Sequence, residues 1–353
     1  MMSMFRAIAG GAAAFLPLAL LLVSGAEAQS NQQLYEAAKG EKELLIYAGG
    51  PTAPYTKLAA DFEKKFPGIK INVKGGFSNV LNEEIEKQLS AGALQVDMAF
   101  FQTAQDFIGW KKRNILLNHL VADHDKIIPA FKDPDGAYTT ARVFPIAYVY
   151  NVNGVAASDA PRSALDFLKP QFQGKIITCY PADDDATLYL FHTLVQKYGW
   201  SYMEKYMANK PKFVQGHLGV ARSVASGESL VSFDATATTV GATKQGGAPI
   251  ELAIPADDPI VFFTLTGAIF KQAPHSNAAR LFLNWYMEPE QQVATGAFSA
   301  RTDVPPPPPF KPLQTYKDGL DYNAFVSNEP LVKELRARFE KITGPVVNTG
   351  GVQ

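Results

Sequence analysis

The chain has 353 residues, of which 47% are hydrophobic, and its 33 basic and 34 acidic side chains give a formal net charge of −1. This balance creates no overall field that would attract nucleic acid or an anionic membrane, so we expect neither as a partner. The length and the apolar content are sufficient for two lobes with hydrophobic cores. Cys179 is the only cysteine, so an intramolecular disulfide is excluded and the core must hold the fold.

Residues 1–28 are typical of a secretory signal peptide. Arg6 precedes an apolar run from Ala7 to Val23, and Ala26-Glu27-Ala28 forms a small-x-small cleavage signature. The run is too short and wrongly flanked for a helix that spans a bilayer. A lipoprotein would need a cysteine at the cleavage site, where none stands. We therefore predict export into the periplasm with removal of this segment.

Helices and strands alternate after the predicted cleavage site. Apolar residues at helical or alternating spacing predict helix 32–39, strand 44–47, helix 55–66, strand 69–73, helix 80–89 and strand 96–101. Strands separated by helices pair in parallel through right-handed crossovers. This order predicts one lobe of the doubly wound α/β type.

The loops that follow these strands contain candidate ligand contacts. Glycines in residues 48–55 would let a ligand approach the backbone, and the helix that follows favours an anionic group at its N-terminus. Ser78 could contact a ligand or cap its helix. Phe100 and Phe101 must face opposite sides of their strand, so one of them could line a cleft. The candidate contacts from these loops are Thr52, Tyr55, Ser78 and Gln102.

Two long apolar segments are predicted to cross between the lobes. One is residues 138–151, and the chain returns at residues 258–264, which includes the candidate contact Thr264. Two such strands would form a hinge. Arg142 lies within the first segment, and a buried unpaired guanidinium is costly. Arg142 is therefore expected either to form a fixed ion pair between the lobes or to bind a carboxylate or phosphonate of the ligand.

The predicted domains follow from these crossings. Lobe 1 comprises residues 29–140 and 259–310, and lobe 2 comprises residues 141–258. Within lobe 2 we predict helix 164–168, strand 175–179 and helix 186–198, and helix 276–287 follows the second crossing. Five prolines at 305–309 predict a rigid extended spacer. Residues 311–353 are expected to form a C-terminal helical segment, with a helix at 331–342.

An acidic cluster lies between a predicted strand and a predicted helix. Among Asp183, Asp184 and Asp185, one is expected to cap the helix, and the others could bind an amino group or, with Asp234, a hard cation. The spacing does not match a calcium loop, and the five histidines form no metal-binding pattern. We predict no metal and no cofactor. The candidate contacts from this region are Tyr180, Asp183 and Asp234.

Residues 219–255 read as helix, strand, helix and strand. The first helix ends at Gly227, and the strand at 230–233 opens at Asp234-Ala235-Thr236 into the second helix. A helix that ends in Val-Ala-Ser-Gly-Glu, a strand, and then Gly-Ala-Pro-Ile-Glu-Leu-Ala-Ile-Pro resembles the extracellular solute-binding proteins of ABC importers. The resemblance is to the branch that contains ferric-iron, thiamine and polyamine binders, and it extends over nearly the whole mature chain.

The resemblance implies a periplasmic-binding-protein type II fold: two α/β lobes, each with a doubly wound mixed sheet, joined by two crossing strands around a cleft. Iron-binding members carry an adjacent pair of tyrosines where this chain has residues 234–238, and often a histidine in the loop matching residues 48–55. Both features are missing from this sequence.

These observations predict a monomeric substrate-binding protein, without enzymatic activity, that delivers a small polar or zwitterionic anion to an ABC permease. Alternatives are a metal or metal-chelate binder that uses Tyr180 and residues 183–185, a polyamine or thiamine binder, and a secreted enzyme with His217 or Asp234 as base. The sequence has no nucleophile elbow, phosphate-binding loop or dinucleotide fingerprint. The predicted ligand contacts are Thr52, Tyr55, Ser78, Gln102, Arg142, Tyr180, Asp183, Asp234 and Thr264.

Overall fold

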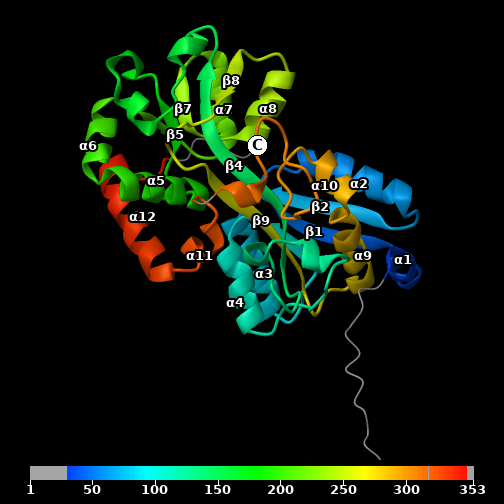
Figure 1. Ribbon diagram of the computed structural model, residues 1–353. Helices are drawn as coiled ribbons and strands as arrows, with labels where there is room; N and C mark the ends of the chain where they lie inside the picture. Colours follow the sequence, from blue (N-terminus) through cyan, green and yellow to red (C-terminus); the bar gives the residue numbers. More distant parts are fainter. Residues whose placement is uncertain (1–29, 317, 348–353) are drawn as a thin grey trace, which may run out of the picture.

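A computed structural model describes residues 30–316 and 318–347 (Figure 1). The predicted signal peptide, residues 1–28, lies outside this range. Along the described residues, no helix is both long enough and apolar enough to cross a membrane.

The first part of the chain follows the predicted alternation of helices and strands. Its elements are α1 (Asn31–Ala38), β1 (Glu43–Gly49), α2 (Ala53–Lys65), β2 (Lys70–Gly76), α3 (Ser78–Ser90), β3 (Met98–Phe101) and α4 (Ala104–Lys112). β1 pairs in parallel with both β2 and β3, as the alternation predicted. α4 was not predicted.

The structure contradicts the expectation that Phe100 or Phe101 lines a cleft. Both side chains are fully buried. The Phe100 ring contacts Tyr286 on one side of the sheet, and the Phe101 ring contacts Phe107 and Trp110 on the other. Helices cover both faces of these parallel strands, so both residues of the alternating pair are core residues.

β4 (Thr139–Asn151) and β9 (Val261–Ile269) are the two crossing strands. The first part of β4 pairs antiparallel with β9, and its last part pairs antiparallel with β7 (Val231–Thr236) and β8 (Ile250–Ala253). β9 in turn pairs antiparallel with β3. The strand order β2-β1-β3-β9-β4-β7, with β8 on β4, is therefore one mixed sheet that runs through both halves of the molecule.

The second half adds a short parallel pair and four helices. These elements are β5 (Ile177–Cys179), α5 (Asp185–Tyr198), α6 (Ser201–Ala208), β6 (Lys212–Val214), α7 (His217–Ser226) and α8 (Ala237–Gln245). β5 pairs with β6, and an isolated bridge from Ile176 to Val231 connects this pair to β7. The helix predicted at 164–168 is a 3-10 helix, and the other 3-10 segments are 124–126, 129–131, 157–159, 170–172 and 313–315.

The last helices pack back onto earlier parts of the chain. They are α9 (Ser276–Tyr286), α10 (Pro289–Ala294), α11 (Tyr322–Val326) and α12 (Glu329–Thr343). Figure 1 shows α12 beside α5, where the Phe339 ring contacts Phe191 and Trp200. The proline segment 305–309 lies outside helices and strands, as predicted.

Hydrophobic side chains form separate clusters in the two halves. One cluster includes Phe62, Phe282 and Trp285, and another includes Phe191 and Phe233. Burying a large apolar side chain stabilises the folded state by about 1.5–3 kcal/mol. Each half therefore has its own core, and the crossing strands connect the two.

Candidate ligand-binding site

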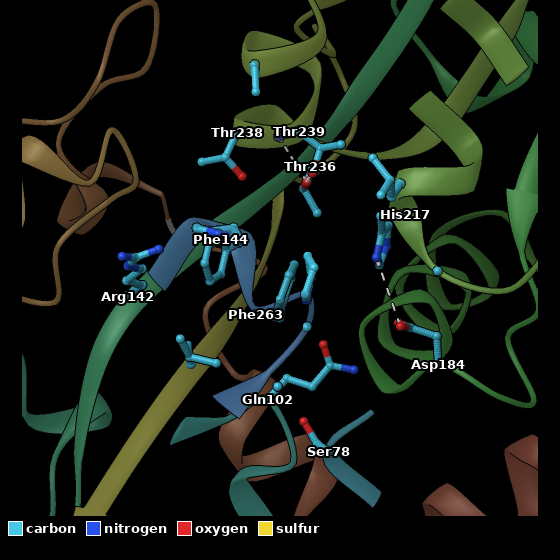
Figure 2. Close-up of a pocket in the computed structure, with 18 of the residues that line it drawn as sticks. Ser78, Gln102, Arg142, Phe144, Asp184, His217, Thr236, Thr238, Thr239 and Phe263 are labelled. Atoms are coloured by element: carbon cyan, nitrogen blue, oxygen red, sulfur yellow. Dashed lines mark hydrogen bonds and ion pairs between the residues drawn. The ribbon is translucent and has the colours of Figure 1, made fainter. Parts of the chain in front are cut away.

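A pocket of about 500 Å³ lies over the crossing strands β4 and β9 (Figure 2). Its lining also includes the loop after β1 and the first residues of α3, α7 and α8. These segments come from both halves of the molecule. The pocket is thus the place where both halves can contact one ligand.

Alternation along the crossing strands determines the floor of the pocket. Arg142 pairs with Leu265 and Phe144 pairs with Phe263, and all four line the pocket. The rings of Phe144 and Phe263 stack with their centroids 5.0 Å apart. Thr264 faces the opposite side of β9, is fully buried and donates a 2.7 Å hydrogen bond to the Asn323 side chain. This candidate therefore lies outside the lining, because successive strand residues face opposite sides.

Arg142, one of the floor residues, lies between two tyrosine rings. Its Cζ is 5.9 Å from the ring centroid of Tyr55 and 5.4 Å from that of Tyr286. Its Nε is buried without a hydrogen-bond partner, and none of the ion pairs formed by the described residues involves Arg142. The structure thus contradicts the alternative of a fixed ion pair between the lobes. Burial raises the pKa of Tyr55, so its phenol is neutral beside the guanidinium.

Two helix N-termini point polar groups at the pocket. Ser78 is the first residue of α3, and the preceding Phe77 occupies the N-cap position without a side-chain cap. The alternative that Ser78 caps its helix is therefore wrong. α8 begins after Thr236, whose hydroxyl accepts a 3.4 Å hydrogen bond from the amide of Thr239. Free N–H groups at helix N-termini favour an anion, so both ends add positive potential.

Gln102 and Tyr55 complete the predicted contacts that line the pocket. Gln102 follows β3, and Figure 2 shows its carboxamide near the floor, above Ser78. Tyr55 belongs to α2, and its ring lies near Arg142. Of the predicted contacts, the structure brings together Tyr55, Ser78, Gln102 and Arg142.

His217 lines the pocket, although the sequence prediction did not include it among the contacts. It is the first residue of α7, lines the pocket, and stacks its ring on Phe263 at 5.9 Å. Its Nε2 lies 3.0 Å from Asp234 Oδ1, and its Nδ1 lies 4.0 Å from Asp184 Oδ2. Burial lowers the pKa of His217, but the Asp234 and Asp184 carboxylates have the larger opposite effect and raise the pKa to about 9. His217 is therefore a cation at neutral pH.

Asp234 supports His217 and does not line the pocket. The side chain is fully buried, and its oxygens accept hydrogen bonds from the Thr178 hydroxyl, the Cys179 amide and the Thr187 hydroxyl at 2.8–3.0 Å. Burial alone would raise the pKa of Asp234, but His217 and these donors hold it below its ordinary value. Of this buried pair, His217 lines the pocket and the predicted contact Asp234 does not.

Each acid of the 183–185 cluster has a partner within the protein. Asp184 is the N-cap of α5 and accepts a 2.9 Å hydrogen bond from the Thr187 amide, which confirms that one of the acids is a cap. Asp183 accepts a hydrogen bond from Gln215, and Asp185 pairs with Arg336. Of these acids, Asp184 lines the pocket and Asp183 does not.

The remaining candidates lie outside this lining. The Tyr180 ring packs on Phe213 at 5.4 Å and is nearly buried. The Thr52 hydroxyl accepts a 3.1 Å hydrogen bond from the Gly75 amide, and Thr52 lines a second pocket of about 270 Å³ with Glu63 and Lys70. Neither side chain faces the floor made by β4 and β9.

Cys179, His217 and Asp234 are close enough to be considered as a metal site. Their potential ligand atoms lie within 4.8 Å of one another. A metal would require a thiolate and a neutral imidazole. Burial raises the pKa of the Cys179 thiol well above its ordinary value, and the pKa of His217 is raised to about 9. In these protonation states His217 and Asp234 form a hydrogen-bonded ion pair, with Nε2 3.0 Å from Oδ1.

The fold and the pocket between its halves define a type II periplasmic binding protein. The model of the bacterial extracellular solute-binding protein family matches residues 48–293, and the chain belongs to this family, which comprises substrate-binding proteins of ABC transporters. A search of curated proteins with the sequence finds no match.

Solved structures of the same fold bind different solutes. The chain is similar to iron-bound HitA from Pseudomonas aeruginosa, with 17% identity over 84% of this chain and 99% of that chain and a TM-score of 0.68. It is also similar to the fructose-6-phosphate complex of AfuA from Actinobacillus pleuropneumoniae (19% identity, 84% and 98% covered, TM-score 0.67). A substrate-binding protein of an ABC transporter from Agrobacterium tumefaciens has 15% identity, 86% and 94% coverage and a TM-score of 0.70. At these identities the similarity shows the fold alone.

Proposed function

We propose that this protein is the substrate-binding component of an ABC importer and captures a small organic anion or zwitterion in the pocket over β4 and β9. The proposal rests on the surroundings of Arg142. Its Nε is buried without a partner, and its guanidinium is paired with no carboxylate of the described residues. The guanidinium contacts the phenol of Tyr286, which carries no charge to balance it. Because a buried charge without a counter-charge is costly, an anionic ligand is the missing partner.

The rest of the lining supports an anion. The N-termini of α3 and α8 and the protonated His217 add positive potential, and Asp184 is the one acid among the described lining residues. Burial raises the pKa of Asp184, and the protonated His217, with Nδ1 4.0 Å from Asp184 Oδ2, offsets part of the charge of this carboxylate. The Asp184 Oδ2 atom, at the end of the pocket opposite Arg142, can accept an amino group of a zwitterion (Figure 2).

Capture requires the two halves to move relative to each other. We propose residues 29–140 and 259–310 as lobe 1 and residues 141–258 as lobe 2, with β4 and β9 as the hinge. Closure would bring Ser78 and Gln102 of lobe 1 and His217 of lobe 2 onto the same ligand. The predicted export segment and the family favour a periplasmic monomer that hands its ligand to a permease without chemical change.

The pocket favours an organic anion over iron. HitA is iron-bound, but here Tyr55 is the one phenol of the described lining residues, and burial raises its pKa. A ferric site needs several deprotonated oxygen ligands, which this lining does not offer. The fructose-6-phosphate complex of AfuA illustrates that this fold can hold a phosphorylated solute.

Thermal unfolding of the mature protein with a panel of ligands tests the proposal. The panel contains phosphonates, carboxylates, amino acids, polyamines, thiamine and ferric chelates. A ligand at about a hundred times its Kd stabilises the folded state by about 2.7 kcal/mol. We expect anions to raise Tm; a response to polyamines or ferric chelates alone would overturn the proposal.

The Arg142→Ala variant should weaken binding of the responding anion by more than about tenfold, since a charge-assisted hydrogen bond contributes about 1.5–3 kcal/mol. The affinity of the Arg142→Lys variant should lie between those of the wild type and Arg142→Ala, because lysine keeps the charge but loses the bidentate geometry. Arg113→Ala is the control, since Arg113 pairs with Glu86 away from the pocket. If calorimetry gives the same Kd for Arg142→Ala and the wild type, Arg142 does not contact the ligand.

A further inference from the structure

The floor of the pocket contains a row of rings. Phe144 and Phe263 stack at 5.0 Å with 22° between their planes, and the His217 imidazole stacks on Phe263 at 5.9 Å and 10°. Arg142 precedes Phe144 by two residues on the same face of β4 and stands at the end of this row opposite His217 (Figure 2). Because the rings face one another, they present their edges to the pocket. Ring edges carry partial positive charge.

Apolar side chains also form much of the pocket wall. Leu265 extends the floor, Leu218 follows His217 in α7, and the ring of Phe77, 38% exposed, stands at the start of α3. Pro51 and Pro54 line the loop side. A small inorganic anion at Arg142 would leave these surfaces in contact with water inside a pocket of about 500 Å³. An apolar ligand body would displace that water and gain hydrophobic stabilisation.

We propose, on the basis of the proposed function, that the ligand is an organic anion with a flat aromatic body. Its acid group binds Arg142, and the face of its ring lies on the edges of Phe144 and Phe263. This edge-to-face arrangement brings the negative π-face of the ligand against the positive ring edges. Leu218 and Phe77 then cover the sides of the ring.

Carboxylate and carboxamide acceptors for a sugar-like body are few in the lining. Among the described lining residues, Asp184 is the one carboxylate and Gln102 the one carboxamide, and Asp184 Oδ1 already accepts from the Thr187 amide. The hydroxyls of Ser78 and of five threonines also line the pocket, and they can donate to an acid group as well as accept from a ligand hydroxyl. The row of rings and the apolar wall, and not these polar groups, therefore favour the aromatic body.

Calorimetry with compounds that share an acid group tests the inference. The pairs are phenylphosphonate with methylphosphonate and benzoate with acetate, and cyclohexanecarboxylate separates flatness from apolar size. We expect the aromatic member of each pair to bind about tenfold tighter or more than the aliphatic member. Benzoate should likewise bind about tenfold tighter or more than cyclohexanecarboxylate. Saturation-transfer NMR should show the strongest transfer to the ring protons.

The Phe144→Leu variant should reduce severalfold the preference of the pocket for the aromatic member of each pair. Phe77→Ala, at the exposed rim, provides a second test should Phe144→Leu unfold. Val80→Ala is the control, because Val80 is 55% exposed and lies outside the lining. Aliphatic anions that bind as tightly as aromatic ones, through Arg142, would overturn this inference and leave anion capture intact. Failure of both series to bind would overturn the inference and count against anion capture itself.

Discussion

Asp234 sets the charge of a pocket residue, His217, although Asp234 itself does not line the pocket. His217 presents its ring to the pocket, whereas Asp234 is fully buried behind it, with Nε2 and Oδ1 3.0 Å apart. Donors from Thr178, Cys179 and Thr187 keep Asp234 charged in a place where a carboxylate alone would be costly. The charge of His217 is therefore set by residues that a ligand does not touch.

The His217→Gln variant should lose stability in a pH-dependent way. The pKa of His217 is raised from 6.5 to about 9 in the folded state, so its contribution is fully present below pH 6.5 and is lost as the pH rises through about 9. As an order of magnitude this contribution is about 3 kcal/mol. Urea unfolding should show the difference between wild type and variant at its largest near pH 6.

The His192→Gln variant is the matched control for this pH dependence. Burial lowers the pKa of His192, so its effect has the opposite sign: the wild type loses stability as the pH falls through 6.5. A difference between wild type and His217→Gln that stays constant from pH 6 to 9 would mean that His217 is not a protonated partner of Asp234.

At the scale of elements, α7 and α8 place His217 and Thr236 at the pocket on either side of β7. α7 ends at Gly227, as the sequence predicts, and this glycine has φ +78° in the left-handed region. Gly241 lies inside α8 instead. A Cβ at Gly241 would meet nothing within 4 Å, and a Cβ at Gly227 would meet only Asn151 Nδ2 at 3.8 Å. The two glycines therefore differ in backbone conformation and not in available space.

Substitution of these two glycines by alanine should have opposite effects. Gly227→Ala should lower the free energy of unfolding by about 1 kcal/mol, because alanine is strained in the left-handed region. Gly241→Ala should raise it by up to about 1 kcal/mol, since alanine favours the helix interior. Chemical denaturation of both variants measures these changes. Equal changes of the same sign would show that the cap conformation does not limit the stability of α7.

At the scale of the whole molecule, the proposed hinge and the pocket share the strands β4 and β9. β4 pairs with β9 at one end and with β7 and β8 at the other, so a bend along β4 changes the distance between the halves. The floor residues Arg142 and Phe263 lie on these strands, while the main cores around Phe282 and Phe191 lie on either side. Movement at the hinge can then leave both cores intact.

Small-angle X-ray scattering should show a smaller radius of gyration with the bound anion than without it, because closure excludes solvent from the pocket. The Arg142→Ala variant at the same ligand concentration is the control and should keep the ligand-free value. An unchanged radius at saturating ligand would indicate binding to a preformed pocket without closure.

The sequence by itself determined most of the elements, the parallel pairing of β1 with β2 and β3, the crossing strands and the family resemblance. These features follow from hydrophobic periodicity and turn residues, which act locally. It also singled out Arg142, because a charge within an apolar strand is conspicuous, and it showed the absence of the tyrosine pair of the iron binders.

Only the tertiary structure decided which side chains line the pocket. The register of β4 and β9 places Phe263 there and turns Thr264 toward α11, and the same strand sequence would fit either face. Asp184 caps α5 and Asp234 is buried in a hydrogen-bond network, so of His217 and Asp234 it is His217 that lines the pocket. Hydrogen bonds between residues distant in the chain settle these choices, and local sequence carries no signal for them.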